Sequence, residues 1–94
     1  MYARQTTDRL TTDGLVCGRG VLYGISGTTN GTNDVTIKVY DSLDASGKIA
    51  RTIKIPAARL FGSVDFSVGI MMNNGIYVDV EGTGGAYWIT FSID

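Results

Sequence analysis

Two acidic residues and a glycine lie close together in the segment 41–47, which reads DSLDASG and offers oxygen atoms to a hard cation. Calcium takes six to eight oxygen ligands from a sharply bent loop. The segment has carboxylates at Asp41 and Asp44, but it lacks the alternating oxygen ligands and the final glutamate of an EF-hand loop. It therefore predicts a structural turn and no metal site.

A second pair of carboxylates, Asp79 and Glu81, would share one face of a strand, because side chains two residues apart point the same way. Two carboxyl groups that face one cleft are the machinery of a glycoside hydrolase. The sequence indicates no pocket for a sugar. We expect the pair to keep a strand face soluble.

Motifs for nucleophilic catalysis and for phosphate binding are incomplete. The sequence has no histidine and a single cysteine, Cys17. Ser-His-Asp and Cys-His catalysis and histidine-based metal sites are therefore excluded. The glycines at 18, 20, 82, 84 and 85 precede no helix-forming segment, whose N-terminus a phosphate cradle needs. We expect a protein that is not an enzyme and binds no cofactor, with Cys17 as a small buried apolar residue.

The overall composition limits the partners. Eight basic and nine acidic side chains give a net charge of −1, which supplies no positive field for a nucleic acid. No apolar stretch approaches the roughly 20 residues of a membrane-spanning helix, and no secretory signal is predicted. A chain of 94 residues fits one domain, and its small core favours self-association.

Short apolar stretches between Gly, Asn, Asp and Ser predict an all-β fold. Val, Ile and Thr account for 28 of the 94 residues, and these side chains favour strands. Alternation is clearest at 35–40, 76–81 and 87–93, and the only candidate for a helical turn is 57–60. Strands are predicted at 15–19, 20–26, 35–41, 49–55, 64–68, 69–72, 76–81 and 87–93, some of which merge if the turns between them are absent. We expect a small antiparallel β-sandwich, jelly-roll-like or Ig-like, of about seven to eight short strands. It would occupy residues 14–94, with residues 1–13 as a polar N-terminal arm.

Three aromatic residues, Tyr40, Tyr77 and Trp88, fall out of phase with the core positions of their strands. Such rings pack under loops, contact another protein, or stack on sugars, and the sequence leaves these alternatives open. The predicted contact residues also include four positions in the arm. They are Tyr2, Arg4, Arg9 and Leu10.

The order of the turn and core motifs resembles that of small β-sandwich proteins of tailed-phage virions. The motifs are GVLYGI at 20–25, a Gly/Thr/Asn loop, VYDSLDASGKIA at 39–50, IPA at 55–57, FSVGI at 66–70, NGIYV at 74–78 and GT at 82–83. The resemblance covers residues 20–93 and implies a protein on the capsid surface that decorates or cements the head. Its implied partners are the major capsid protein and copies of itself, as a trimer. Two alternatives are a carbohydrate-binding module of a head or tail fibre, which would bind a surface glycan, and a structural protein of the tail or connector.

Overall fold

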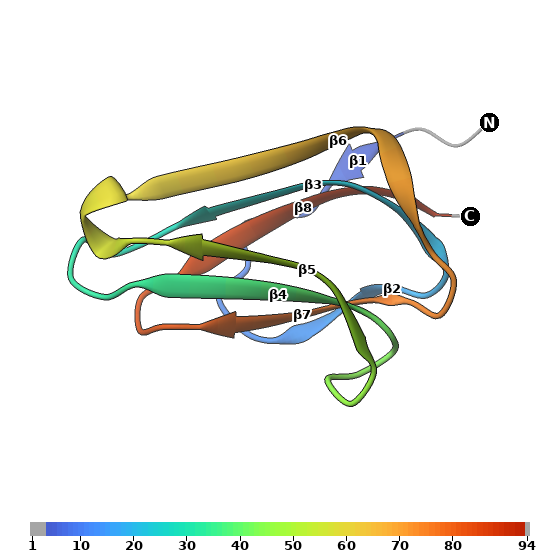
Figure 1. The fold of residues 1–94 in the computed structure, drawn as a ribbon, viewed down its shortest axis with the longest axis horizontal. Coiled ribbons are helices and arrows are strands. Elements are labelled where there is room, and N and C mark those ends of the chain that lie inside the picture. Colours follow the sequence, from blue (N-terminus) through green and yellow to red (C-terminus); the bar gives the residue numbers. More distant parts are fainter. Residues whose placement is uncertain (1–3, 94) are drawn as a thin grey trace.

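The chain is described over residues 4–93 by a computed structural model, which is built almost entirely of β-strands (Figure 1). The all-β prediction is confirmed. The expected helical turn is present as one short 3-10 helix, η1. The elements are β1 Gln5–Thr6, β2 Gly14–Cys17, β3 Gly20–Thr28, β4 Val35–Asp41, β5 Lys48–Ile55, η1 Ala57–Arg59, β6 Phe61–Met72, β7 Ile76–Glu81 and β8 Ala86–Ile93.

The strands form two antiparallel four-stranded sheets that pack face to face (Figure 1). The first sheet has the order β1-β8-β3-β6, and the second has the order β2-β7-β4-β5. The first strand thus pairs with the eighth, the second with the seventh, the third with the sixth and the fourth with the fifth. This winding of four antiparallel pairs is the jelly-roll topology. Of the two sandwich types expected from the sequence, the structure has the jelly roll.

Alternation along each strand sends one set of side chains into the core between the sheets. In β4 the residues expected to face inward, Val35, Ile37 and Val39, are fully buried. In β8 the expected inward residues are buried except at the strand's end, where Ile93 is 50 % exposed. The core consists of Leu22, Ile25, Val35, Ile37, Val39, Ile55, Met72, Ile76, Val78, Tyr87, Ile89 and Phe91.

Two predicted strands, 64–68 and 69–72, merge into the single strand β6. Residues 66–69 of β6 have no pairing partner in β3, and the strand bulges there. Gly69 has φ +87° at this point, and a Cβ there would lie 2.5 Å from Cγ1 of Val21, so the bend requires glycine. The bulge leaves Val68 92 % exposed.

The described part of the N-terminal segment lies along β8 at the edge of the first sheet. β1 pairs with β8, and the Thr7 amide donates to the Ile89 carbonyl at 3.0 Å. Leu10 and Tyr87 exchange two backbone hydrogen bonds of 3.0 and 2.8 Å. Residues 4–13, expected as an arm beside the domain, are therefore hydrogen-bonded to its sheet.

Candidate contact surface

Two of the predicted contact residues, Tyr40 and Tyr77, meet on the outer face of the second sheet. They are cross-strand partners in β4 and β7, with ring centroids 6.1 Å apart and ring planes at 71°. This edge-to-face geometry is favourable for aromatic pairs. Tyr40 is only 8 % exposed although it points away from the core, so neighbouring side chains also cover this outer face.

The tyrosine pair is the centre of a row of large side chains that crosses all four strands. Leu15 of β2 is the cross-strand partner of Tyr77, and Ile49 of β5 is the partner of Tyr40. We call Leu15, Tyr77, Tyr40 and Ile49 the apolar row. Its two ends are open to solvent, with Leu15 50 % and Ile49 44 % exposed.

A fifth apolar side chain adjoins this row from the loop after β4. Leu43 is 59 % exposed, and its Cδ2 lies 3.1 Å from the Cβ position of Gly75, which directly precedes β7. Leu43 therefore reaches the same end of the second sheet as Tyr77.

Sequence reasoning missed both ends of the apolar row. Counting back in twos from Ile53, which packs against the core, places Ile49 on the inner side of β5. The pairing of β4 with β5 shifts at Ala50, which has no partner, so Ile49 lies opposite Tyr40 and faces outward. No feature of the sequence marks this bulge.

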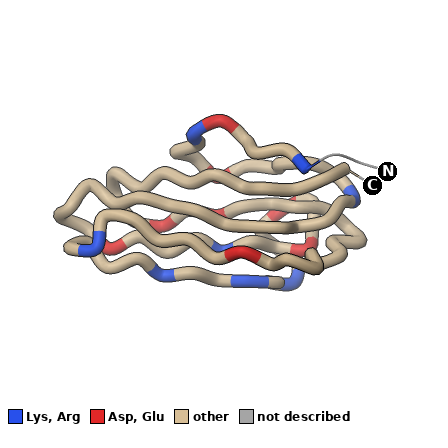
Figure 2. Tube along the Cα trace, turned by 90° about the horizontal axis from the view of Figure 1, so that it is seen from above, with Lys and Arg blue, Asp and Glu red and all other residues tan. Residues whose placement is uncertain are grey.

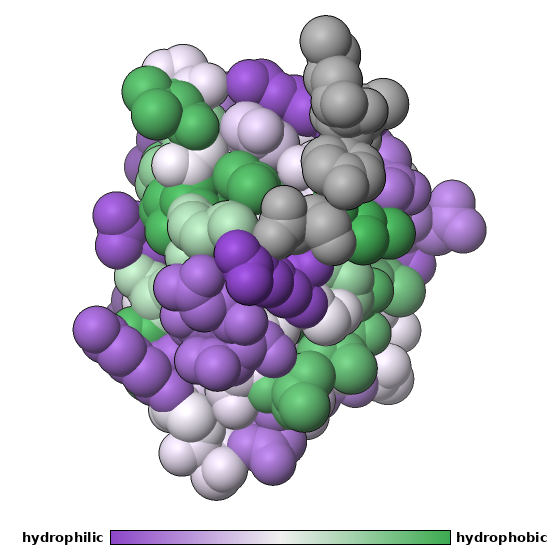
Figure 3. All heavy atoms as spheres, turned by 90° about the vertical axis from the view of Figure 1, so that its right-hand side faces the viewer, coloured by the Kyte–Doolittle hydropathy of each residue, from purple (hydrophilic) through white to green (hydrophobic). Residues whose placement is uncertain are grey.

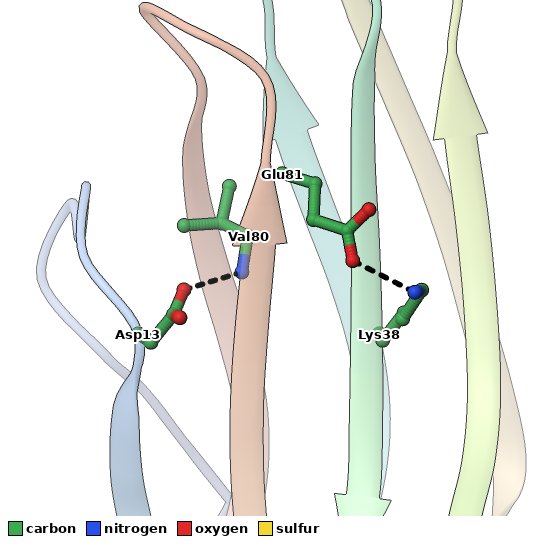
Figure 4. A network of polar contacts seen from close by, with 4 residues as sticks. All are labelled: Asp13, Lys38, Val80 and Glu81. Atoms are coloured by element: carbon green, nitrogen blue, oxygen red, sulfur yellow. Dashed lines mark hydrogen bonds and ion pairs between the residues drawn. The ribbon is translucent and has the colours of Figure 1, made fainter. Parts of the chain in front are cut away.

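Charged residues lie beside the apolar row on the same face, and Figure 4 shows two of their contacts. Lys38 Nζ lies 2.7 Å from Glu81 Oε2, and Asp13 Oδ1 accepts a hydrogen bond of 2.8 Å from the Val80 amide. The ion pair raises the pKa of Lys38 and lowers the pKa of Glu81. Burial raises the pKa of Asp79, and the Asp13 and Glu81 carboxyl groups beside it raise it further. Asp79 and Glu81 thus belong to a polar network on the sheet surface.

Trp88 lies on the other side of the sandwich. Tyr87 and Ile89 on either side of it face the core, so Trp88 projects from the outer face of the first sheet, where it is half-buried. The three aromatic residues singled out in the sequence therefore form no common platform. Two lie on the second sheet and one on the first.

The predicted contact residues of the N-terminal segment lie along the first sheet. The Arg4 guanidinium stacks on the ring of Tyr23, 3.8 Å from its centroid, and donates a hydrogen bond of 3.1 Å to the carbonyl of Ser67. Arg9 is exposed, whereas Leu10 is half-buried and packs against the core. Tyr2 lies outside the described residues.

The side of the sandwich formed by β5 and β6 carries shallow open pockets between the two sheets. One is lined by residues of β5, η1 and β6, and another by the opposite ends of β5 and β6. Basic residues Lys48, Arg51 and Lys54 follow β5 along this long edge of the molecule (Figure 2). The end of the sandwich seen in Figure 3 shows hydrophobic side chains in separate patches between hydrophilic ones.

The acidic segment after β4 is a turn held by its own side chains. Asp44 Oδ1 accepts a hydrogen bond of 2.9 Å from the Ser46 amide, and hydrogen bonds from Ser46 lower the pKa of Asp44. Asp41 Oδ1 accepts from the Asn74 amide at 2.9 Å. Residues 4–93 contain no group of three or more His, Cys, Asp or Glu residues placed to hold a metal ion.

Two further features bear on reactivity and location. Cys17 is half-buried, and burial raises the pKa of its thiol. Within the described part of the chain, no helix has the length and apolar character needed to cross a membrane.

Comparison of the chain with models of protein families, with curated proteins and with solved structures gives no match.

Proposed function

We propose that this chain is a non-enzymatic structural protein of a phage virion, which decorates or cements the capsid through contacts with the major capsid protein and with copies of itself. The observation that carries the proposal is the apolar row with the adjoining Leu43. Larger exposed apolar patches mark interaction sites, and Leu15, Leu43 and Ile49 are exposed on this face around the tyrosine pair. The jelly roll is a scaffold of viral capsid domains and of lectins, and residues 20–93 resemble phage virion proteins.

The geometry of the aromatic residues supports a protein partner over a glycan. A sugar-stacking platform needs rings that lie side by side with open faces. Tyr40 is 8 % exposed and meets Tyr77 edge to face, whereas Trp88 belongs to the other sheet. A protein surface can instead cover Leu15 and Ile49 together with the tyrosine pair, because all four lie in one line across the sheet.

The test is binding of the purified protein to phage capsids that lack it, measured by co-sedimentation. Wild-type protein should co-sediment in a saturable way, since many weak contacts add up on a repeating lattice. Ile49→Lys should lower the apparent affinity about tenfold or more, because it places a charge in the apolar row. Val68→Lys is the matched control: Val68 is 92 % exposed, lies on the other sheet, and should leave binding unchanged.

Three results would contradict the proposal. They are absence of the wild-type protein from sedimented capsids, binding to isolated tails in place of heads, and retention on host polysaccharide. The second would favour a structural protein of the tail or connector, and the third a carbohydrate-binding module.

A further inference from the structure

We propose that the outer face of the second sheet pairs with the same face of a second copy of this chain, about a two-fold axis that lies between the copies and runs parallel to the strands. The inference rests on the proposed function only in treating this face as a contact surface. It names the occupant of the face, and it replaces the three-fold assembly expected from the sequence with a two-fold pair.

The charges on this face are divided by strand. The acidic residues lie on the side of β2 and β7, with Asp79 and Glu81 in β7 and Asp13 directly before β2. The basic residues lie on the side of β4 and β5, with Lys38 in β4 and Lys54 in β5. One half of the face is therefore negative, and the other half is positive.

The register sorts the outward residues of the sheet into rows that run across the strands. The apolar row joins Leu15, Tyr77, Tyr40 and Ile49. In the next row Asp79 lies opposite Lys38, and in the row after that Glu81 lies opposite Thr36, with Lys54 beyond it in β5. An axis parallel to the strands reverses the strand order of the second copy but keeps each row at its own level.

Rotation about this axis places each side chain of the apolar row opposite a different apolar or aromatic side chain of the second copy. β2 of one copy lies over β5 of the other, and β7 lies over β4. Leu15 then faces Ile49 of the second copy, and Tyr77 faces Tyr40. Each contact occurs twice because a two-fold interface is isologous.

In the charged rows the same operation brings opposite charges together. Asp79 of each copy faces Lys38 of the other, and Lys54 faces the corner between Asp13 and Glu81. An axis across the strands would superpose the apolar rows equally well, but it would point the charged rows of the two copies in opposite directions, so that neither row meets charges of the other copy. Electrostatic complementarity therefore selects the axis parallel to the strands.

The size of the face sets the expected strength. Strands about 4.8 Å apart and side-chain rows about 7 Å apart give four strands and three rows a flat area of about 400 Å². With the relief of the side chains, the two copies together bury roughly 1,000 Å², close to the lower limit for a specific interface. The pair should therefore associate with a Kd in the micromolar range, on the order of 1–100 μM.

The experiment measures the mass of the whole chain in solution by sedimentation equilibrium across this concentration range, without capsids. Lys38→Glu and Asp79→Lys each place like charges face to face twice in a pair of identical copies, so each variant alone should dimerise about tenfold or more weakly than wild type. An equimolar mixture of the two variants restores both opposite-charge contacts and should dimerise again. Val68→Lys on the first sheet is the control and should match wild type.

Recovery of the dimer in the mixture supports the inference. A monomer at every concentration, a trimer, or a dimer that withstands both single charge reversals overturns it. Circular dichroism of each variant shows that it is folded, and the mixture remains informative because it uses the same two proteins. Capsid binding is a separate readout: a dimer that ignores capsids contradicts the proposed function alone, and a monomer that binds capsids contradicts this inference alone.

Discussion

Tyr87 connects the N-terminal segment to the core, and we predict that removing its hydroxyl group destabilises the fold. The side chain is 1 % exposed, and its Oη donates a hydrogen bond of 2.7 Å to the carbonyl of Thr12. Tyr87→Phe keeps the ring in the core and deletes this bond, which costs about 1–1.5 kcal/mol of unfolding free energy. In a domain of this size, each kcal/mol lowers Tm by roughly 4–8 °C. We therefore expect a Tm about 4–12 °C below that of wild type, by the same conversion.

The pH dependence of stability gives a second, independent signature of this hydroxyl. Burial raises the pKa of Tyr87 to about 12, whereas a tyrosine in the unfolded chain titrates near its ordinary value of about 10. Above about pH 10 the unfolded state loses a proton that the folded state keeps, so stability falls as pH rises, by at most about 1.4 kcal/mol per pH unit. The Tyr87→Phe variant should lack this contribution.

The assay is urea unfolding at pH 7 and at several values between about pH 9 and 11.5, followed by circular dichroism. Tyr23→Phe is the matched control, because that hydroxyl makes no hydrogen bond within residues 4–93 and the stacking of Arg4 on the ring is retained. If Tyr87→Phe unfolds at the same urea concentration as wild type at pH 7, or keeps the full alkaline slope, the hydroxyl does not anchor the N-terminal segment.

Three further predictions concern the core, the charged face and the cysteine. Gly27→Ala should lower the free energy of unfolding by about 1–3 kcal/mol, because the new Cβ would lie 2.4 Å from Cδ1 of Ile37. Adding Ile37→Val removes that methyl group and should recover part of the loss, as measured by urea unfolding. If the effects of the two substitutions simply add, the two side chains do not clash. Asp79→Asn should raise the Tm at pH 7. The pKa of Asp79 is raised in the folded state, so once the pH exceeds about 4 the folded protein has to hold a negative charge beside Asp13, and this destabilises it relative to the unfolded chain. An unchanged Tm would be the opposing result. Cys17 should react with a thiol reagent about tenfold or more slowly in the folded than in the unfolded protein at pH 8, because burial disfavours its thiolate; equal rates would show that the thiol is open to solvent.

The sequence predicts the fold where one period governs a whole strand. Val35, Ile37 and Val39 alternate with polar residues over all of β4, so the inner face could be read directly. The choice between a jelly roll and an Ig-like sandwich depends on which distant strands pair, as in Gln5 opposite Phe91, and local patterns carry no information about such pairs. The sequence places a strand boundary at Gly69, whereas the structure has a bulge there inside the single strand β6.

The candidate surface was predictable only in part, for a related reason. Tyr40 and Tyr77 could be identified because their strands alternate regularly, but which sheet each aromatic residue joins depends on topology. Trp88 was therefore grouped with residues of the opposite sheet. Ile49 could not be placed, because the unpaired Ala50 reverses the direction of every side chain before it in β5.

The edge strands of the two sheets are protected against pairing with another chain, so we expect a protein partner to contact a sheet face instead. An unprotected edge strand offers free backbone groups to another chain, and proteins block such edges with charges, bulges or short strands. Here β5 carries Lys48, Arg51 and Lys54, β6 is interrupted by the bulge at 66–69, and the other two edge strands are short, with four residues in β2 and two in β1. The apolar row crosses the outer face of the second sheet from one edge strand to the other. A partner that avoids the edges and covers this row must pack against the sheet from outside, which is the geometry of the two-fold pair.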